Sequence, residues 1–330
     1  MDYAAIAAEF LRVLRGKRSQ GALCRRLKFR SNVVHQWERG RSFPTAARAL
    51  WVASRLGVNV REAFREFYRV EPPWLAQVDP ASPEGVAAFL RDLRGSTKVV
   101  DLARYSGRSR FVIARWLSGD TEPRLHDFFA LVECCSLRLL DFLEPFVDVK
   151  ALPSVRDAWN KLQVARRLAY DEPWSQAVLR ALELKQYAEL PAHQEGWIAA
   201  QIGVARSVET RCLRRLAESG QIEWRDERWH VSNVMAVDLR RDPQAARRLR
   251  GWWLRQGALH AEAGKRGVMY NVFSLSSADL ARVRELQKDY LSALRAIVAR
   301  SEPVEHVVLA ADLLLELGEV TAPTAGPNPG

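Results

Sequence analysis

Two amide side chains, those of Asn32 and Gln36, stand four residues apart in the stretch SNVVHQWE at residues 31–38. If this stretch is helical, both amides lie on one face, and Val34 and Trp37 turn towards a core. An amide group can form a pair of hydrogen bonds with the major-groove edge of adenine, which an aliphatic side chain cannot. The pattern therefore predicts a helix that reads DNA bases. Its outward face would carry Ser31, Asn32, His35 and Gln36.

The residues around this helix predict a pair of short helices joined by a tight turn. The run SQGALCRRL at residues 19–27 has apolar residues at helical spacing, residues 28–30 form the turn, and Gly40 closes the second helix. Ser19 and Ser31 are the predicted N-caps, because a hydroxyl oxygen accepts hydrogen bonds from the free N–H groups of a first helical turn. Two short helices joined in this way form a helix-turn-helix, whose second helix can enter a major groove.

Residues 10–64 resemble the helix-turn-helix domain of the Xre and phage-repressor family. The resemblance includes the WERGR at residues 37–41 and the Pro44 that opens the next helix. It implies a lambda-repressor-like fold and binding to double-stranded DNA. The alternative is a small helical domain that keeps this fold for packing or for protein contacts.

The same resemblance implies a role for individual residues. In that family the residue at the Gln20 position contacts a phosphate. Those at the positions of Ser31, Asn32 and Gln36 read bases, and those at the positions of Arg39 and Arg41 hold the DNA backbone. Arg30 replaces the family's usual Ser or Thr cap, which moves the predicted cap to Ser31. The expected DNA contacts are Gln20, Arg30, Ser31, Asn32, His35, Gln36, Arg39 and Arg41.

The positive charge of the chain is concentrated at this motif. The net charge is +11, and residues 1–70 alone carry 15 Lys and Arg against 5 Asp and Glu. The remaining segments are close to neutral. An excess of basic side chains that coincides with a matched motif indicates that they neutralise DNA phosphates.

Length and composition exclude several other classes of protein. The chain has 330 residues, 48% of them apolar and 27% charged, which favours two to four globular domains. No apolar run is long enough for a membrane span, and we expect no secretory signal.

The four cysteines show no C-x-x-C spacing, which favours a reducing cytoplasm without disulfides. We expect no metal, no cofactor and no membrane contact, and a location with the nucleoid.

An internal repeat follows the first motif after a predicted linker at residues 71–83. With an offset of 79 residues, 12 of the 55 positions from 10 to 64 are identical to those from 89 to 143, mostly at core and cap sites. This predicts a second, diverged helix-turn-helix over residues 84–150.

The second copy differs where the first is expected to touch DNA. Val99 replaces Gln20, Phe111 replaces Asn32, and its segment carries a net negative charge. We therefore expect this copy to pack against its neighbour or a partner chain rather than to read bases. Contact of Phe111 with a thymine methyl is the alternative. Basic residues that leave secondary DNA contacts open are Arg108, Arg110 and Arg115.

Residues 151–235 predict a winged helix. Helical patterns at about 155–169, 174–189, 195–202 and 207–219 precede a hairpin of residues 222–225 and 228–231. Winged helices bind DNA but also serve as dimerisation modules, so both roles stay open. Possible DNA contacts here are Arg206, Arg211 and Arg214.

The last part, residues 236–320, predicts a small α/β unit for dimerisation or sensing. Helices at 243–263 and 277–300 alternate with β-rich runs at 268–275 and 304–315, and residues 321–330 form a disordered tail. The sheet edge could pair with another chain. A ligand pocket is also conceivable, although aromatic residues at such spacing are more often core. Its expected lining is Trp252, Trp253, Tyr270 and Phe273.

The C-terminal half, about 155–317, resembles an uncharacterised bacterial regulator family. The resemblance rests on GWIA with L-x-x-L-x-x-x-G-x-I, and on YNVFSLSSADLARVRELQKDYLSAL. Members of that family join a helix-turn-helix region to a C-terminal domain of unknown function, which implies transcriptional regulation and little more.

Together these patterns predict a mainly α protein with two tandem lambda-repressor-like helix-turn-helix domains, a winged helix and a small C-terminal α/β unit. The expected function is that of a bacterial transcription regulator, a homodimer on an inverted repeat, with a small-molecule or protein effector at its C-terminal half. The alternative is a protein-interaction module such as an antitoxin or a sigma-factor partner. An enzyme is not expected. Asp171, Glu172 and His193 lie close in sequence, but no catalytic motif accompanies them.

Overall fold

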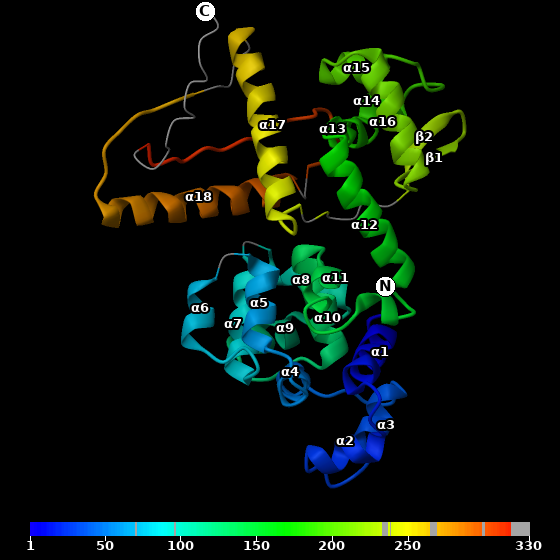
Figure 1. The fold of residues 1–330 in the computed structure, drawn as a ribbon, viewed down its shortest axis with the longest axis vertical. Coiled ribbons are helices and arrows are strands. Elements are labelled where there is room, and N and C mark those ends of the chain that lie inside the picture. The colour runs from blue at the N-terminus through cyan, green and yellow to red at the C-terminus, as the bar shows by residue number, and fades with distance from the viewer. Residues whose placement is uncertain are drawn as a thin grey trace, which may run out of the picture.

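The protein is mainly helical, as its sequence predicts. The computed structural model describes residues 1–69, 71–95, 97–232, 237, 239–264, 269–298 and 301–317. Over these residues it has 18 α-helices, one short 3-10 helix at Val149–Ala151 and one two-stranded sheet. Helices α1 to α11 form one group, and the long helix α12 leads from it to the remaining elements (Figure 1).

The predicted pair of short helices forms within a set of five, and the second of the pair begins at residue 33, two residues after its predicted start. The five helices are α1 (Tyr3–Arg15), α2 (Gln20–Arg26), α3 (Val33–Glu38), α4 (Ala46–Arg55) and α5 (Val60–Tyr68). Each begins after a side chain that accepts a hydrogen bond from its first turn. These capping side chains belong to Asp2, Ser19, Asn32, Thr45 and Asn59.

The predicted cap of α3 is wrong by one residue. Asn32, and not Ser31, caps the helix, because its Oδ1 accepts a hydrogen bond from the His35 N–H at 3.3 Å. Asn and Ser are about equally good caps, so their adjacency in the sequence could not settle which of them turns towards the helix.

The segment expected to be a linker contains a packed helix. Helix α6 (Pro73–Gln77) buries Leu75 completely, and the ring of Trp74 lies edge-on to Phe64 at 5.9 Å. The prolines before and after α6 break helical continuity, as expected, but they do not produce a free connection. The residues on either side are therefore joined through a shared apolar core.

The next five helices repeat the first five. They are α7 (Pro83–Arg94), α8 (Val99–Ser106), α9 (Arg110–Ser118), α10 (Leu125–Ser136) and α11 (Leu139–Leu143). Their starts lie 77 to 80 residues after those of α1 to α5, as the offset of 79 predicts. One continuous hydrophobic cluster runs from Ile6 to Leu162 and includes core residues of both sets.

The chain then forms a smaller helical unit with a hairpin. Its elements are α12 (Arg156–Asp171), α13 (Trp174–Ala181), α14 (Lys185–Ala188), α15 (Trp197–Ile202), α16 (Arg206–Glu218), β1 (Ile222–Arg225) and β2 (Arg228–Val231). The hairpin and its register, with Ile222 opposite Val231, agree with the sequence pattern. The single helix predicted for 174–189 is wrong, because the chain divides there into α13 and α14.

The α/β unit predicted at the C-terminal end is wrong for the described residues. Helices α17 (Pro243–Glu262) and α18 (Ser277–Val298) form as expected, with Ser276 accepting a hydrogen bond from the Asp279 N–H. Residues 269–276 and 301–316 contain no strand. A β-rich run becomes a strand only when another strand pairs with it, and these two runs are not paired with each other. The tail at 321–330 lies outside the described residues.

The ligand pocket that was the alternative to plain core in the same region is not formed. Trp252 and Trp253 pack edge-on against Trp174, at 5.2 and 5.4 Å between ring centroids. Tyr270 and Phe273 lie on the surface, with Tyr270 90% exposed. The four aromatic side chains therefore do not line one cavity.

Candidate nucleic-acid interface

The outer face of α3 and the residues that flank it form an exposed basic surface. The side chains of Arg30, Arg39 and Arg41 are exposed, and no hydrogen bond or ion pair with a described residue engages them. Ser31 is exposed, and Gln36 is half-buried beside them. Val34 and Trp37 are buried, as the helical spacing predicts. The predicted orientation of the helix is thus confirmed.

Basic side chains near α3 meet almost no acidic side chain of the same segment. Between residues 10 and 61 the only Asp or Glu is Glu38, and it is buried. The surface here therefore carries positive charge with no exposed carboxylate to offset it, which is the condition for attracting a polyanion. The exposed basic residues near α2 and α3 are Lys17, Arg18, Arg25, Arg26, Lys28, Arg30, Arg39 and Arg41.

Glu38 is held in a buried ion pair that fixes α3 against α1. Arg15 donates from Nε to Oε1 at 2.5 Å and from Nη2 to Oε2 at 3.1 Å, and Arg12 donates to the Glu38 carbonyl oxygen at 3.0 Å. Only 3% of the Glu38 side chain is exposed. The hydrogen bond to Glu38 raises the pKa of Arg15 above its usual value. Arg15 therefore stays charged, and the pair fixes the position of α3.

This ion pair was not predicted from the sequence, although the sequence contains a pattern that indicates it. Glu38 follows Val34 by four residues and so lies in the phase of the buried face, where a charge needs a partner. In the second copy, Leu117 occupies the equivalent position while Arg94 is retained. The ion pair could have been predicted from this pattern, in which a charged residue occupies a core position and the second copy has leucine there.

The side chain of Gln20 in α2 forms hydrogen bonds with residues of α3. Its Nε2 donates to Glu38 Oε2 at 2.7 Å, and its Oε1 lies 3.3 Å from His35 Nδ1. Both ends of the amide are thus engaged within the protein. In this arrangement Gln20 links α2 to α3, which differs from the phosphate contact that the resemblance implies.

Asn32 is likewise engaged on one side. Its Oδ1 accepts the cap hydrogen bond from His35 and lies 3.5 Å from the Cys24 Sγ donor. A carbonyl oxygen has two acceptor sites, so the side chain retains only its Nδ2 group for a base. The pairwise contact with adenine expected for Asn32 would require the cap to open, whereas Gln36 has no such constraint.

The expected secondary contacts differ between the two remaining units. In the second copy, Arg108 is paired with Asp127 at 2.9 Å, whereas Arg110 and Arg115 are exposed and unengaged by described residues. Phe111 is 77% exposed. The second copy packs against the first through one shared core, as expected, but this face of α9 is exposed and takes no part in that packing.

The three arginines of the predicted winged helix that were possible DNA contacts all have acidic partners. Arg206 pairs with Glu195, Arg211 with Glu172 at 3.0 Å and Arg214 with Glu218 at 3.9 Å. A DNA phosphate would have to displace these carboxylates.

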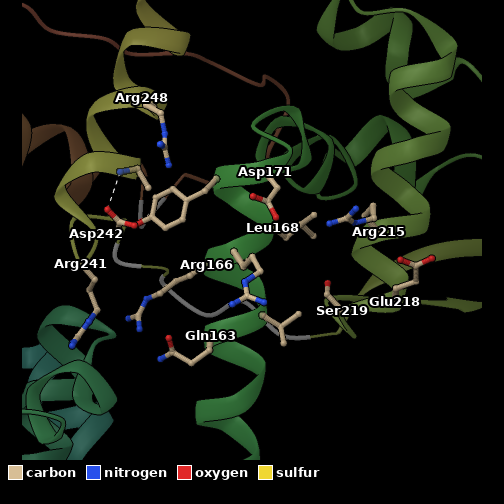
Figure 2. A pocket seen from close by; sticks show the side chains of 14 residues that line it. Gln163, Arg166, Leu168, Asp171, Arg215, Glu218, Ser219, Arg241, Asp242 and Arg248 are labelled. Carbon is tan, nitrogen blue, oxygen red and sulfur yellow. Dashed lines mark hydrogen bonds between the residues drawn. The ribbon is translucent and has the colours of Figure 1, made fainter.

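A cavity of about 780 Å³ lies among α12, α16 and α17 (Figure 2). Two of its arginines are already neutralised at the edge of the first core: Arg166 by Asp141, and Arg241 by Asp141 and Glu144. The remaining cationic side chains in its lining are Arg167, Arg215 and Arg248. The cavity is distinct from the expected aromatic pocket.

The residues weighed for catalysis are not brought together. Glu172 pairs with Arg211, while His193 lies 3.1 Å from the Tyr187 hydroxyl and 3.9 Å from Glu209. Burial lowers the pKa of His193. Among the described residues, no group of three His, Cys, Asp or Glu side chains is placed to hold a metal ion.

No protein-family model, curated protein or solved structure matches the chain. None of the helices in the described ranges combines the length and apolar character needed to cross a membrane.

Proposed function

We propose that this protein is a sequence-specific DNA-binding transcription regulator, with α2 and α3 as a helix-turn-helix and α3 as the reading helix. The observation that carries the proposal is the exposed face of α3. It presents Gln36 among arginines that no described residue pairs with, on the segment 10–61, whose one carboxylate, that of Glu38, is buried and neutralised by Arg15. On such a surface the arginines can neutralise the phosphates of a DNA duplex while the amide of Gln36 contacts base edges in the groove.

The proposal assigns different tasks to the exposed residues. Gln36 reads a base edge with both ends of its amide, Ser31 and His35 contribute single hydrogen bonds, and Asn32 offers its Nδ2. Arg39 and Arg41 neutralise phosphates beyond the end of the helix, as does Arg30 before its start. The tandem lambda-repressor-like arrangement, the winged helix at 151–235 and a location at the nucleoid belong to the same proposal.

Binding should be measured with the full-length protein on duplexes selected from a randomised pool, over a range of salt concentrations. The logarithm of the affinity should fall with the logarithm of the salt concentration, with a slope of about −0.9 for each phosphate neutralised. Arg39→Ala with Arg41→Ala should weaken all duplexes alike and reduce the slope by about two.

The matched variant is Gln36→Ala, which removes a base contact but no charge. It should lower the affinity for the selected site by about tenfold to a hundredfold and leave binding to random duplex unchanged. Equal affinity of the unsubstituted protein for selected and random duplexes would contradict the proposal.

The second candidate function is a protein-interaction module, such as an antitoxin or a sigma-factor partner. It is favoured by the large apolar side chains that lie exposed between residues 269 and 317, including Val272 and Val308. Exposed apolar patches of this kind mark contact surfaces. If this were the main function, any DNA affinity should survive Gln36→Ala and Arg41→Ala together.

A further inference from the structure

The two sets of five helices, α1–α5 and α7–α11, are packed against each other. Several contacts from a residue of the first set to a residue of the second recur between the equivalent residues, from the second set to the first. The Ala46 N–H donates to the Pro123 carbonyl oxygen at 3.0 Å, and the Leu125 N–H donates to the Pro44 carbonyl oxygen at 2.9 Å. The offset of 79 takes 44 to 123 and 46 to 125, so these are the same bond in both directions. The residues between the partners form an antiparallel bridge.

The apolar core repeats this exchange. The rings of Phe10 and Phe146 are 6.1 Å apart, and those of Phe89 and Phe67 are 6.0 Å apart. The offset takes 10 to 89 and 67 to 146, so the two ring pairs are equivalent. Each joins the first helix of one set to the residues at the end of the other set.

The helices follow the same rule. Helix α1 packs against α10 and the equivalent α7 packs against α4, while α5 packs against its own equivalent, α11. Contacts in which each half offers the same patch to the other are those of a two-fold interface between identical subunits. Here both halves belong to one chain, so a local two-fold relates α3 to α9.

We infer that this chain contains within itself the two-fold that dimeric regulators obtain by association, and that α9 contacts the second half-site of the same DNA duplex. The inference rests on the proposed function. Two-fold-related reading helices bind half-sites about one helical turn apart. The prediction of a homodimer on an inverted repeat is thereby replaced by one chain on one site.

The surface of α9 fits a duplex, but a different sequence from the one that α3 reads. Arg110 and Arg115 are exposed and unengaged by described residues. The offset takes 36 to 115, so Arg115 stands at the position equivalent to Gln36 and can form a pair of hydrogen bonds with guanine, while Arg110 can neutralise a phosphate. Phe111 and Ala114, both exposed, lie between them and can contact the methyl groups of thymine. The expected site is therefore not palindromic: an amide reads one half, and a guanidinium with apolar groups reads the other.

The first test is a selection by the full-length protein from duplexes with about 30 randomised base pairs, enough for two half-sites one turn apart. The expected motif is non-palindromic, with two blocks about 10 base pairs between centres. Sedimentation of the complex should give one chain for each bound site, whether or not chains associate through another surface.

Footprinting on the selected duplex assigns each block to a helix. Phe111→Ala with Arg115→Ala should remove protection from one block, and Gln36→Ala with Arg39→Ala from the other, each with a loss of about tenfold or more in affinity. The matched control is Arg282→Ala, an exposed arginine of α18 that, within the described part of the chain, pairs with Asp279 alone. It should leave both blocks protected.

The outcomes separate the inference from the proposed function. If the unsubstituted protein selects no motif, both are overturned. If it selects a palindrome bound by two chains, or if the Phe111 and Arg115 substitutions leave the footprint unchanged, the inference is overturned and the proposed function stands.

Discussion

Glu38 is the residue on which the position of the reading helix depends. It is buried, and its carboxylate is bound by Arg15 and Gln20. Removing one partner of a buried ion pair leaves an uncompensated charge, which costs about 3–5 kcal/mol. Glu38→Ala, however, leaves Arg15, which is partly exposed and keeps its hydrogen bonds to the Gly16 and Arg18 carbonyl oxygens. We therefore expect Glu38→Ala to lower the free energy of unfolding, measured with urea, by about 1–3 kcal/mol.

The second copy supplies the control for this prediction. Leu117 stands at the position equivalent to Glu38, so a leucine fits this place in the fold. Arg15→Leu with Glu38→Leu should recover most of the lost stability, since well-packed apolar residues often replace a buried ion pair without loss. Glu66→Ala, at an exposed site, should have little effect. A double variant as unstable as Glu38→Ala would contradict this account.

Asn32 is expected to have two separable tasks, a cap and a DNA contact. Asn32→Asp keeps an oxygen for the cap but removes the amide donor and places a carboxylate near the DNA. Its thermal stability should be unchanged, whereas its affinity for the selected duplex should fall at least about tenfold. Asn32→Ala should lose about 1 kcal/mol of stability as well. Equal effects of the two variants on stability would mean that the cap does not hold α3.

His193 makes the stability of the unit at 151–235 depend on pH. Burial lowers its pKa below the unfolded value of about 6.5, so the unfolded chain binds the proton more tightly. Stability from this group is complete above pH 6.5 and is lost as the pH falls below it. The melting temperature should therefore fall between pH 7 and pH 5, and fall less in His193→Gln. His126, whose pKa burial also lowers, accounts for part of the remaining slope, and His306→Gln serves as the exposed control.

At the scale of elements, local signals predicted the helices well. Helix ends follow from capping residues and apolar spacing, which act within a few residues, and both ends of α16 lie within one residue of the predicted 207–219. The errors lie where distant parts of the chain decide. The Arg15–Glu38 pair joins α1 to α3, and Leu75 is buried by helices before and after it. The β-rich runs near 270 and 308 lacked partner strands, which no local pattern reveals.

The hairpin β1–β2 has a turn that its residues do not favour. Asp226 and Glu227 both adopt positive φ angles, 50° and 55°. Hairpin turns of this shape prefer Asn-Gly, because a side chain in the left-handed region is strained. Asp226→Asn with Glu227→Gly should raise the free energy of unfolding by about 1 kcal/mol in a thermal or urea titration. An unchanged or lower stability would show that the turn is not strained.

At the scale of the whole molecule, the described residues between 269 and 317 carry many exposed apolar side chains, as surfaces that contact another chain do. Val272 and Val308 are 77% and 78% exposed. Because they are already in water, Val272→Asp with Val308→Asp should not destabilise the fold. If copies of the chain associate through this surface, sedimentation should show assemblies at high concentration that the double variant lacks. Identical sedimentation of both proteins would exclude this surface as a contact.

In the binding mode that we infer, the 79-residue repeat gives the molecule a direction along DNA. A symmetric dimer on a palindrome looks the same from either end and cannot distinguish upstream from downstream. A chain whose two reading helices differ, α3 with its amide and α9 with its phenylalanine, would settle on its site in one orientation only. The C-terminal half would then always lie on the same side of the site. Reversing the site in front of a promoter would therefore change the effect of the protein on transcription from that promoter.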